Sequence, residues 1–305
     1  MDRIDTMAAF VAAVDEGSLS GAARRLGRSP AAITRAIAAL EARAGTRLLH
    51  RTTRVVALTE AGGRYLETCR RILADLEEAD LLAAGERATP HGTLTLSAPL
   101  IFGRLYVRPL VDAFRESYPA VRVKLLLFDR VANLIEEGMD AAVRIGHLPD
   151  SGLVAVKAGE VRLVLCASPE YLMRHKAPRV PADLSRHECI SNSAVTPTET
   201  WTFASGSRSH LHVHVQPHLI VNHPEAAIAS ALEGRGVTRV LSYQIERDLR
   251  AGRLETMLER FEPPPLPVHV IYPAARLAAA KVKAFVALAV PRLKAELARI
   301  NRAIG

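Results

Sequence analysis

Eight arginines and no lysines supply the positive charge of one short segment, residues 24–54. The segment holds a single acid, Glu41, whereas the stretch from Glu60 to Glu86 is acidic, so the positive charge is local. A guanidinium suits guanine edges, phosphates and narrow minor grooves better than a lysine ammonium does. The pattern favours contact with nucleic acid, with an ordinary solvated charged face as the alternative interpretation. The arginines are Arg24, Arg25, Arg28, Arg35, Arg43, Arg47, Arg51 and Arg54.

Alternating histidines indicate a second possible chemistry. His210, His212 and His214 would project from one face of a strand, where imidazoles can bind zinc, copper or nickel. A metal-responsive regulator that uses these three residues is the alternative function. An exposed polar strand face has the same pattern.

Signatures of catalysis are missing from the sequence. It has no phosphate-binding glycine loop and no Gly-x-Ser-x-Gly elbow, and His187-Glu188 is followed by Ser191 where a zinc-protease helix needs a second histidine. We therefore expect neither an enzyme nor a cofactor. Cys69, Cys166 and Cys189 are odd in number and far apart, so no disulfide framework is expected, and a redox pair of Cys166 with Cys189 is a minor alternative.

The bulk properties favour a protein of the cytoplasm. The 305 residues are enough for two or three domains, and the net charge of +8 permits a polyanionic partner. The first five residues include acids where a secretory signal would be basic and then apolar, and no apolar run is as long as a bilayer span. We expect no membrane partner.

The arginine-rich segment lies within a predicted helix-turn-helix. Met7, Phe10, Val11 and Val14 recur at helical spacing. Ser18 then caps a second helix that runs to about Leu26, and the chain turns at Gly27-Arg28. Ser29-Pro30 begins a third helix that runs to about Ala44, where Gly45 ends it in a left-handed conformation.

The third helix has one face to bury and one to present. At roughly 100° per residue, Ile33, Ala36, Ile37, Leu40 and Ala44 fall on one side, so the opposite side can approach a groove. We expect Arg35 to read bases directly, with Ser29 and Thr34 as phosphate or base contacts. The complete predicted DNA-binding set is Arg28, Ser29, Ala31, Thr34, Arg35, Ala38, Arg51 and Arg54.

A wing follows the third helix. Residues 47–58 form two short β-prone runs around a polar tip. Arg51 and Arg54 at that tip could enter the flanking minor groove, where narrow A·T tracts have the most negative potential.

The same residues resemble the LysR-type transcriptional regulators over about sixty positions. The similarity lies in residues 17–26, 29–37, Leu40-Glu41, Arg51 and 58–62. Family members commonly have an aromatic residue in place of Leu49 and an amide in place of Arg28, and the second difference bears on operator preference. The resemblance implies double-stranded DNA and a small-molecule effector as partners, a homodimer or homotetramer, and RNA polymerase as a further candidate partner.

A long helix is predicted after the wing. Thr59 can cap a helix from Glu60 to about Glu86, on which apolar residues alternate by four and three as in a heptad seam. We expect two subunits to pair through this seam; the alternative is packing of the helix on its own domain. The seam residues are Tyr65, Cys69, Ile72, Leu76, Ala79 and Ala83.

The remaining two thirds alternate strand and helix patterns, which predicts an α/β domain. The expected strands are 93–97, 121–128, 140–145 and 161–167, and the expected helices are 104–118, 131–138, 225–233 and 276–300. In the LysR family this region is a two-lobed domain of the type II periplasmic-binding-protein kind. The expected domains are a winged helix-turn-helix at 1–58, a linker and dimerisation helix at 59–88, and an effector-binding domain at 89–305, with lobe I at about 92–163 and 268–300 and lobe II at about 164–267.

The effector is expected at the carboxyl ends of strands, where ligands bind in open α/β sheets. Ser97 to Leu100, after the first strand, is the leading candidate segment. Arg144 could hold the carboxylate of a ligand or form a structural ion pair. After Val237 the proline-containing strand end usual in the family is replaced by residues 239–242, which puts the loop geometry there in question. The predicted effector-binding set is Ser97, Ala98, Pro99, Leu100, Phe102, Phe128, Arg144, Gly146, Asn192, Asn222 and Thr238.

Overall fold

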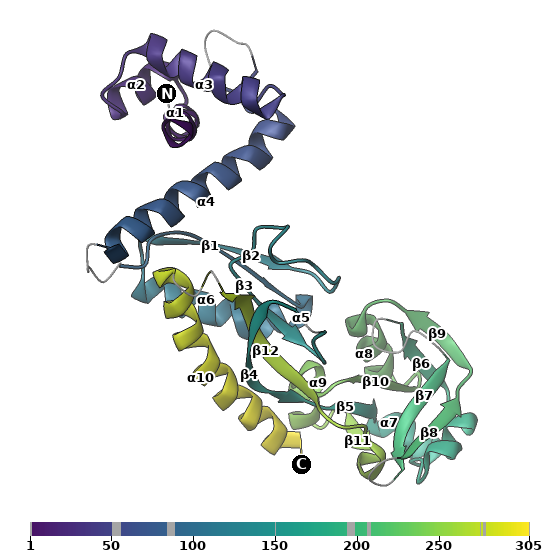
Figure 1. Ribbon diagram of the computed structural model, residues 1–305. Helices are drawn as coiled ribbons and strands as arrows, with labels where there is room; N and C mark the ends of the chain where they lie inside the picture. The colour runs from purple at the N-terminus through teal and green to yellow at the C-terminus, as the bar shows by residue number, and fades with distance from the viewer. Residues whose placement is uncertain are drawn as a thin grey trace. The chain divides into compact units, whose positions relative to one another are not determined.

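A computed structural model describes residues 2–50, 56–83, 89–149, 151–193, 199–205, 209–274, 276 and 279–304 (Figure 1). Its contacts divide the chain into two compact units. Unit 1 comprises residues 1–93 with two short pieces at 120–122 and 279–281, and unit 2 comprises the rest.

Unit 1 is a small helical domain followed by a long helix. Its helices are α1 (Arg3–Asp15), α2 (Leu19–Arg25), α3 (Pro30–Ala44) and α4 (Glu60–Ala83). The Ser18 hydroxyl accepts from the Gly21 amide at 3.0 Å, the Ser29 hydroxyl accepts from the Ala32 amide at 3.2 Å, and Gly45 has φ 66°. These contacts confirm the predicted helix starts and the left-handed terminator.

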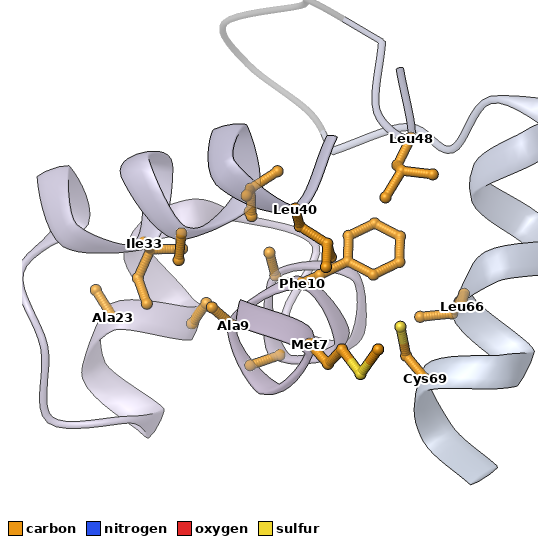
Figure 2. Close-up of a cluster of buried hydrophobic side chains, with 14 residues drawn as sticks. Met7, Ala9, Phe10, Ala23, Ile33, Leu40, Leu48, Leu66 and Cys69 are labelled. Atoms are coloured by element: carbon orange, nitrogen blue, oxygen red, sulfur yellow. The ribbon is translucent and has the colours of Figure 1, made fainter. Parts of the chain in front are cut away.

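The core of unit 1 joins α1, α3 and α4. Phe10, Ile33, Leu40 and Leu48 are fully buried, and Leu66 of α4 is 5% exposed. Figure 2 shows these side chains converging from the three helices and from the segment after α3.

The described arms of the predicted wing pair with each other. Leu49 bridges Leu58 in antiparallel fashion, and the His50 amide donates to the Ala57 carbonyl at 2.9 Å. The predicted tip, with Arg51 and Arg54, lies outside the described residues.

Glu41 ties the first arm to α3. Its side chain is 9% exposed, and one carboxylate oxygen accepts from the backbone amides of Leu48 and Leu49 at 2.8 and 3.1 Å. The other oxygen accepts from Arg47 at 3.1 Å. The chain reversal after α3 therefore depends on a buried carboxylate that satisfies two amides of the arm.

Helix α4 begins as predicted, because the Thr59 hydroxyl accepts from the Gly62 amide at 2.9 Å. The predicted dimer seam is wrong for Cys69, and Tyr65 and Ile72 are already half-buried by their own unit. Cys69 is fully buried in the core of unit 1, and Tyr65 and Ile72 pack against that core. Further along the helix Leu76 is 42% exposed. Residues 84–88, where the helix was expected to end, lie outside the described part of the chain.

Unit 2 is built on two mixed five-stranded sheets, as the α/β prediction requires. The first sheet has the order β2-β1-β3-β12-β4, with β1 parallel to β3 and β12 antiparallel to β3 and β4. Its strands are β1 (Gly92–Ala98), β2 (Val121–Leu127), β3 (Ala141–Ile145), β4 (Leu153–Val161) and β12 (Leu266–Pro273).

The second sheet has the order β11-β5-β10-β6-β9, with β6 parallel to both β10 and β9. Its strands are β5 (Leu163–Ala167), β6 (Cys189–Asn192), β9 (Pro217–Val221), β10 (Val237–Leu241) and β11 (Glu255–Met257). A separate antiparallel pair, β7 (Thr200–Ser205) and β8 (Ser209–His214), packs Trp201 and Phe203 into a core with residues of this sheet.

The helices of unit 2 partly follow the prediction. They are α5 (Leu100–Phe102), a π-helical turn (Gly103–Val107), α6 (Arg108–Ser117), α7 (Pro169–His175), α8 (Pro224–Leu232), α9 (Ser242–Arg250) and α10 (Ala280–Ile304), with short 3-10 turns at Pro181–Arg186 and Glu259–Phe261. Leu297 of α10 lies against Gly159 of β4, and the Phe285 ring meets the Phe114 ring of α6 edge-on, with the ring centroids 5.6 Å apart.

The helix predicted over 131–138 is wrong. This segment is an irregular loop with turns at 134–138, in which Leu134 is 2% exposed and Val131 is 97% exposed. The strand end after Val237, where the sequence departs from the family, continues as β10 to Leu241 and passes directly into α9.

The Glu41 contacts generate a stability prediction. Glu41→Ala leaves two backbone amides without their acceptor, so unit 1 should lose about 1–3 kcal/mol of stability. The single tryptophan, Trp201, reports only on the second sheet's core, whereas far-UV circular dichroism reports on both units. In urea we expect the dichroism transition to move to lower denaturant while the Trp201 fluorescence transition stays in place. Equal transitions in wild type and variant would contradict the role given to Glu41, and Glu67→Ala, an exposed carboxylate on α4, is the control.

Candidate DNA-binding surface and effector cavity

Helix α3 separates its side chains as the periodicity predicts. Ile33, Ala36 and Leu40 are fully buried, and Ile37 is 6% exposed. Ala44, at the end of the helix, is only half-buried. The opposite face, formed by Ala31, Thr34, Arg35 and Ala38, is exposed. Small side chains therefore surround a hydroxyl and a guanidinium on one accessible face.

Most described arginines of the basic segment already have intramolecular partners. Arg25 pairs with Asp15 at 3.3 Å, Arg28 with Asp5 at 2.8 Å and Arg47 with Glu41 at 3.1 Å, and Arg43 donates to the Thr6 hydroxyl. Within the described residues, the exposed guanidinium groups of Arg24 and Arg35 form no ion pair.

The hydroxyls of Ser29 and Thr34, both predicted to contact DNA, differ in the hydrogen bond that each can still form. The Ser29 oxygen accepts the Ala32 amide as a helix cap, so its proton remains able to donate to a phosphate. The Thr34 hydroxyl donates to the Pro30 carbonyl at 3.0 Å, so its oxygen remains able to accept.

Arg24 was missed as a site residue by sequence reasoning. It precedes Arg25 on α2, and the sequence does not tell which of the two reaches Asp15 of α1. The ion pair of Arg25 distinguishes them, because Arg24 has no ion pair among the described residues.

Unit 2 contains a cavity of about 900 Å³, within the size range of small-molecule sites. Its wall draws on residues that follow β1, β2 and β3 in the first sheet, and on residues that end β6 or end and follow β10 in the second. Strand ends of both sheets therefore meet at one concave site, as is usual for ligands of α/β sheets.

The structure places four of the predicted effector residues in the cavity wall: Pro99, Phe128, Arg144 and Asn192. Two others are not in the wall but form hydrogen bonds with wall residues. The Ser97 hydroxyl accepts from Arg144 at 2.9 Å, and the Leu100 amide donates to Asp129, a wall residue, at 3.0 Å.

Five predicted effector residues are not in the wall. Phe102 is buried against Tyr243, with its ring centroid 5.1 Å away, and Ala98 is fully buried. The Thr238 hydroxyl donates to the Ile190 carbonyl at 2.9 Å, and the Gly146 amide donates to the Pro267 carbonyl at 2.8 Å. Asn222 is exposed to solvent.

Sequence reasoning missed the loop residues of the cavity. Leu134, Leu148 and Leu153 line it and belong to one buried or half-buried cluster with Ile271. Tyr243 and Gln244, at the start of α9, also line it. The apolar pair at 134–135 is a signal for these residues, but its spacing also fits the helix predicted over 131–138.

The metal-responsive alternative gains no support. The Thr202 hydroxyl lies 3.2 Å from Nδ1 of His212, and the nearest carboxylate oxygen of Glu199 is 3.8 Å from His214. Among the residues that the structure describes, no three histidine, cysteine or acidic side chains gather closely enough to hold a metal ion.

The cysteines are buried and weakly acidic. Burial raises the pKa of Cys69 to about 11, and it raises the pKa values of Cys166 and Cys189 to about 12. A nearby carboxylate, Asp248 for Cys166 and Glu188 for Cys189, acts in the same direction. These thiols resemble structural fillers rather than reactive cysteines.

A helix-turn-helix unit joined to a two-sheet module with a ligand-sized cavity defines a DNA-binding protein with a sensing domain. Two family models match the chain: the bacterial regulatory helix-turn-helix of the lysR family over residues 4–63, and the LysR substrate binding domain over residues 87–294. The chain belongs to the LysR family of DNA-binding transcriptional regulators.

Relatives of known name align with this chain over nearly its whole length. An HTH-type transcriptional repressor of Pseudomonas aeruginosa is 33% identical over 288 residues, covering 94% of this chain and 90% of that protein. The HTH-type transcriptional activator AaeR of Escherichia coli is 30% identical over 272 residues, covering 89% of this chain and 88% of that protein. These relatives are named as regulators and not as enzymes, as the sequence predicts.

Solved structures of LysR-type regulators have a similar fold over nearly the whole chain. The LysR-type regulator CrgA of Neisseria meningitidis has a TM-score of 0.61 at 29% identity, covering 95% of this chain and 98% of that chain. The full-length virulence activator AphB of Vibrio cholerae has a TM-score of 0.60 at 26% identity, covering 95% and 99%. No helix within the described ranges has the length and apolar character needed to cross a membrane.

Thiol burial generates a second prediction. Because their raised pKa values keep all three thiols protonated at mildly alkaline pH, the native chain should react with a chromogenic disulfide reagent far more slowly than the chain in denaturant. DNA affinity measured under oxidant and under reductant should be equal. Rapid native labelling of Cys166 or Cys189, located by mass spectrometry, would revive the redox alternative.

Proposed function

We propose that this regulator is a homodimer or dimer of dimers whose α3 helices enter successive major grooves of a pseudo-palindromic operator. The observation that carries the proposal is the exposed face of α3, where Arg35 presents a charge that no described carboxylate neutralises. Residues 1–58 read DNA, residues 59–88 link and pair subunits, and residues 89–305 bind the effector, with lobe limits near 92–163, 164–267 and 268–300.

The arginines have different proposed roles in binding DNA. Arg35 reads a base edge, because it lies on α3 beside small residues that permit close approach. Arg24 binds a phosphate. Arg28 contributes less than either, since its charge is shared with Asp5, and Arg51 and Arg54 act from the wing tip.

The cavity is coupled to the contact between the two sheets of unit 2. Tyr243 lines the cavity, and its carbonyl accepts from the Tyr106 hydroxyl at 3.3 Å. Arg299 of α10 also binds Glu246 of α9, with its two terminal nitrogens at 2.6 and 3.2 Å from the carboxylate oxygens. A ligand against Tyr243 would therefore act on these contacts. If the ligand binds one arrangement of the two sheets more tightly than another, it shifts the fraction of molecules that can bind operator.

Subunit pairing is proposed for the second half of α4, where Leu76 and Ala79 are exposed. The first half of this helix is occupied by the core of its own unit. A transcriptional role also implies that the protein acts in the cytoplasm and contacts RNA polymerase, and both are part of the proposal.

The proposal predicts different effects for neighbouring arginines. Arg35→Ala should lose about 1–3 kcal/mol of binding and relax selectivity at one base pair. Arg24→Ala should weaken binding to all sequences alike and reduce the salt slope by about one. Arg25→Ala is the matched control, because Asp15 already neutralises that charge. The measurement is a gel-shift titration on operator and random DNA at several salt concentrations. Wild-type binding by Arg35→Ala on both duplexes would refute the assignment of the reading face.

A further inference from the structure

Arg144 is a half-buried cation in the cavity wall, and no acid in the described part of the chain is bound to it. It lies on β3, and its guanidinium donates to the Ser97 hydroxyl and to the Val143 carbonyl, both at 2.9 Å. The guanidinium carbon lies 5.7 Å from the centre of the Phe128 ring. None of the ion pairs among the described residues includes Arg144. Since a guanidinium has five N–H groups, these two bonds leave donors for a ligand.

Burial makes this charge costly. It lowers the pKa of Arg144, while the Glu137 carboxylate opposes that effect and the Arg130 charge adds to it. Glu137 is itself bound by Arg130, at 2.6 Å from one nitrogen, so its charge is largely committed. A guanidinium keeps its proton in such surroundings, and an acceptor anion would offset its lost hydration.

The rest of the wall has few acids. Arg130 and Arg144 face one carboxylate, Asp129, which already accepts the Leu100 amide. His147 also lines the cavity, and His269 is the direct cross-strand neighbour of Arg144. Directly paired residues share a face of the sheet, so His269 lies on the same side as Arg144. Because Arg130 is paired with Glu137, Arg144 is the wall guanidinium that has no ion pair among the described residues, and a single such cation matches a monoanion better than a dianionic phosphate.

One part of the wall is apolar, whereas Asn133, Ser151, Asn192 and Gln244 add uncharged polar groups elsewhere in it. Leu134, Leu148, Leu153 and Ile271 cluster on one side of the cavity, and Phe128 packs against them. Val131 and Ile135, on the loop over the same cavity, are 97% and 64% exposed. A ligand with an apolar body would cover surface that is now open to water.

We infer that the cavity binds an amphipathic carboxylate, with its anion on the Arg144 guanidinium and its apolar body against Phe128 and the leucine cluster. A planar carboxylate fits the guanidinium fork through two parallel hydrogen bonds. The Ser97 hydroxyl fixes the orientation of the guanidinium from behind. This inference rests on the proposed function, because it names the chemical class of the effector.

The test compares carboxylates with neutral isosteres on the full-length chain. The probes are cinnamate and octanoate, with cinnamamide and octanamide as controls, and binding is measured by titration calorimetry. Each carboxylate should bind about tenfold to a hundredfold more tightly than its amide, as expected for a charge-assisted pair. Equal affinities, failure of both carboxylates to bind, or tighter binding of phenyl phosphate would overturn the inference.

Substitutions of Arg144 test whether the ligand's carboxylate binds at this residue. Arg144→Met should remove the preference for carboxylate over amide, and Arg144→Lys should retain part of it. Arg115→Met, which removes an exposed charge on α6, should leave it unchanged. Preserved carboxylate preference in both Arg144 variants would overturn the assignment, and an unchanged far-UV circular dichroism spectrum and urea transition verify that each variant is folded.

The same samples separate this inference from the proposed function. Carboxylates that bind at Arg144 without changing operator affinity would refute effector control and leave the ligand class standing. Amides that bind equally well and do change operator affinity would refute the ligand class alone.

Discussion

The packing of α3 against α1 is the constraint on which the DNA-binding surface depends. Ile33, Ala36 and Leu40 have no solvent exposure, and Phe10 of α1 fills the space beside them. A helix turns about 100° per residue, so burial of this stripe leaves Thr34 and Arg35 on the opposite side. Burial of the stripe stabilises the unit, and the exposed side is therefore free to carry recognition residues.

Local chemistry explains why this part of the fold could be predicted from the sequence. Ser18, Ser29 and Gly45 act within three residues of themselves, so their capping roles follow from the order of residue types. Partners distant in sequence could not be predicted. The pairing of Arg28 with Asp5, and the packing of Cys69 into the core rather than into a seam, depend on how the helices meet.

The cavity shows the same division. Strand-end reasoning located Arg144 and Phe128, because ligands bind beyond the carboxyl ends of strands. The same reasoning failed for Phe102 and Thr238, which also lie near strand ends. The Phe102 ring packs against Tyr243, and the Thr238 hydroxyl donates to a backbone carbonyl, so neither side chain lines the cavity. The loop at 131–138 misled the prediction, because its apolar residues recur at helical spacing while only Leu134 among them reaches the interior and Val131 and Ile135 stay exposed.

The most direct test of the account is the accessibility of a cysteine placed on the outer face of α3. In the wild-type background, whose own thiols are buried, Thr34→Cys should react rapidly with a maleimide and become protected when the chain binds a duplex selected from a random library. Glu67→Cys on α4 should react equally in both states, and Ile33→Cys should not react in the folded chain. A Thr34→Cys thiol that is unreactive in the free protein, or equally reactive with and without DNA, would contradict the account.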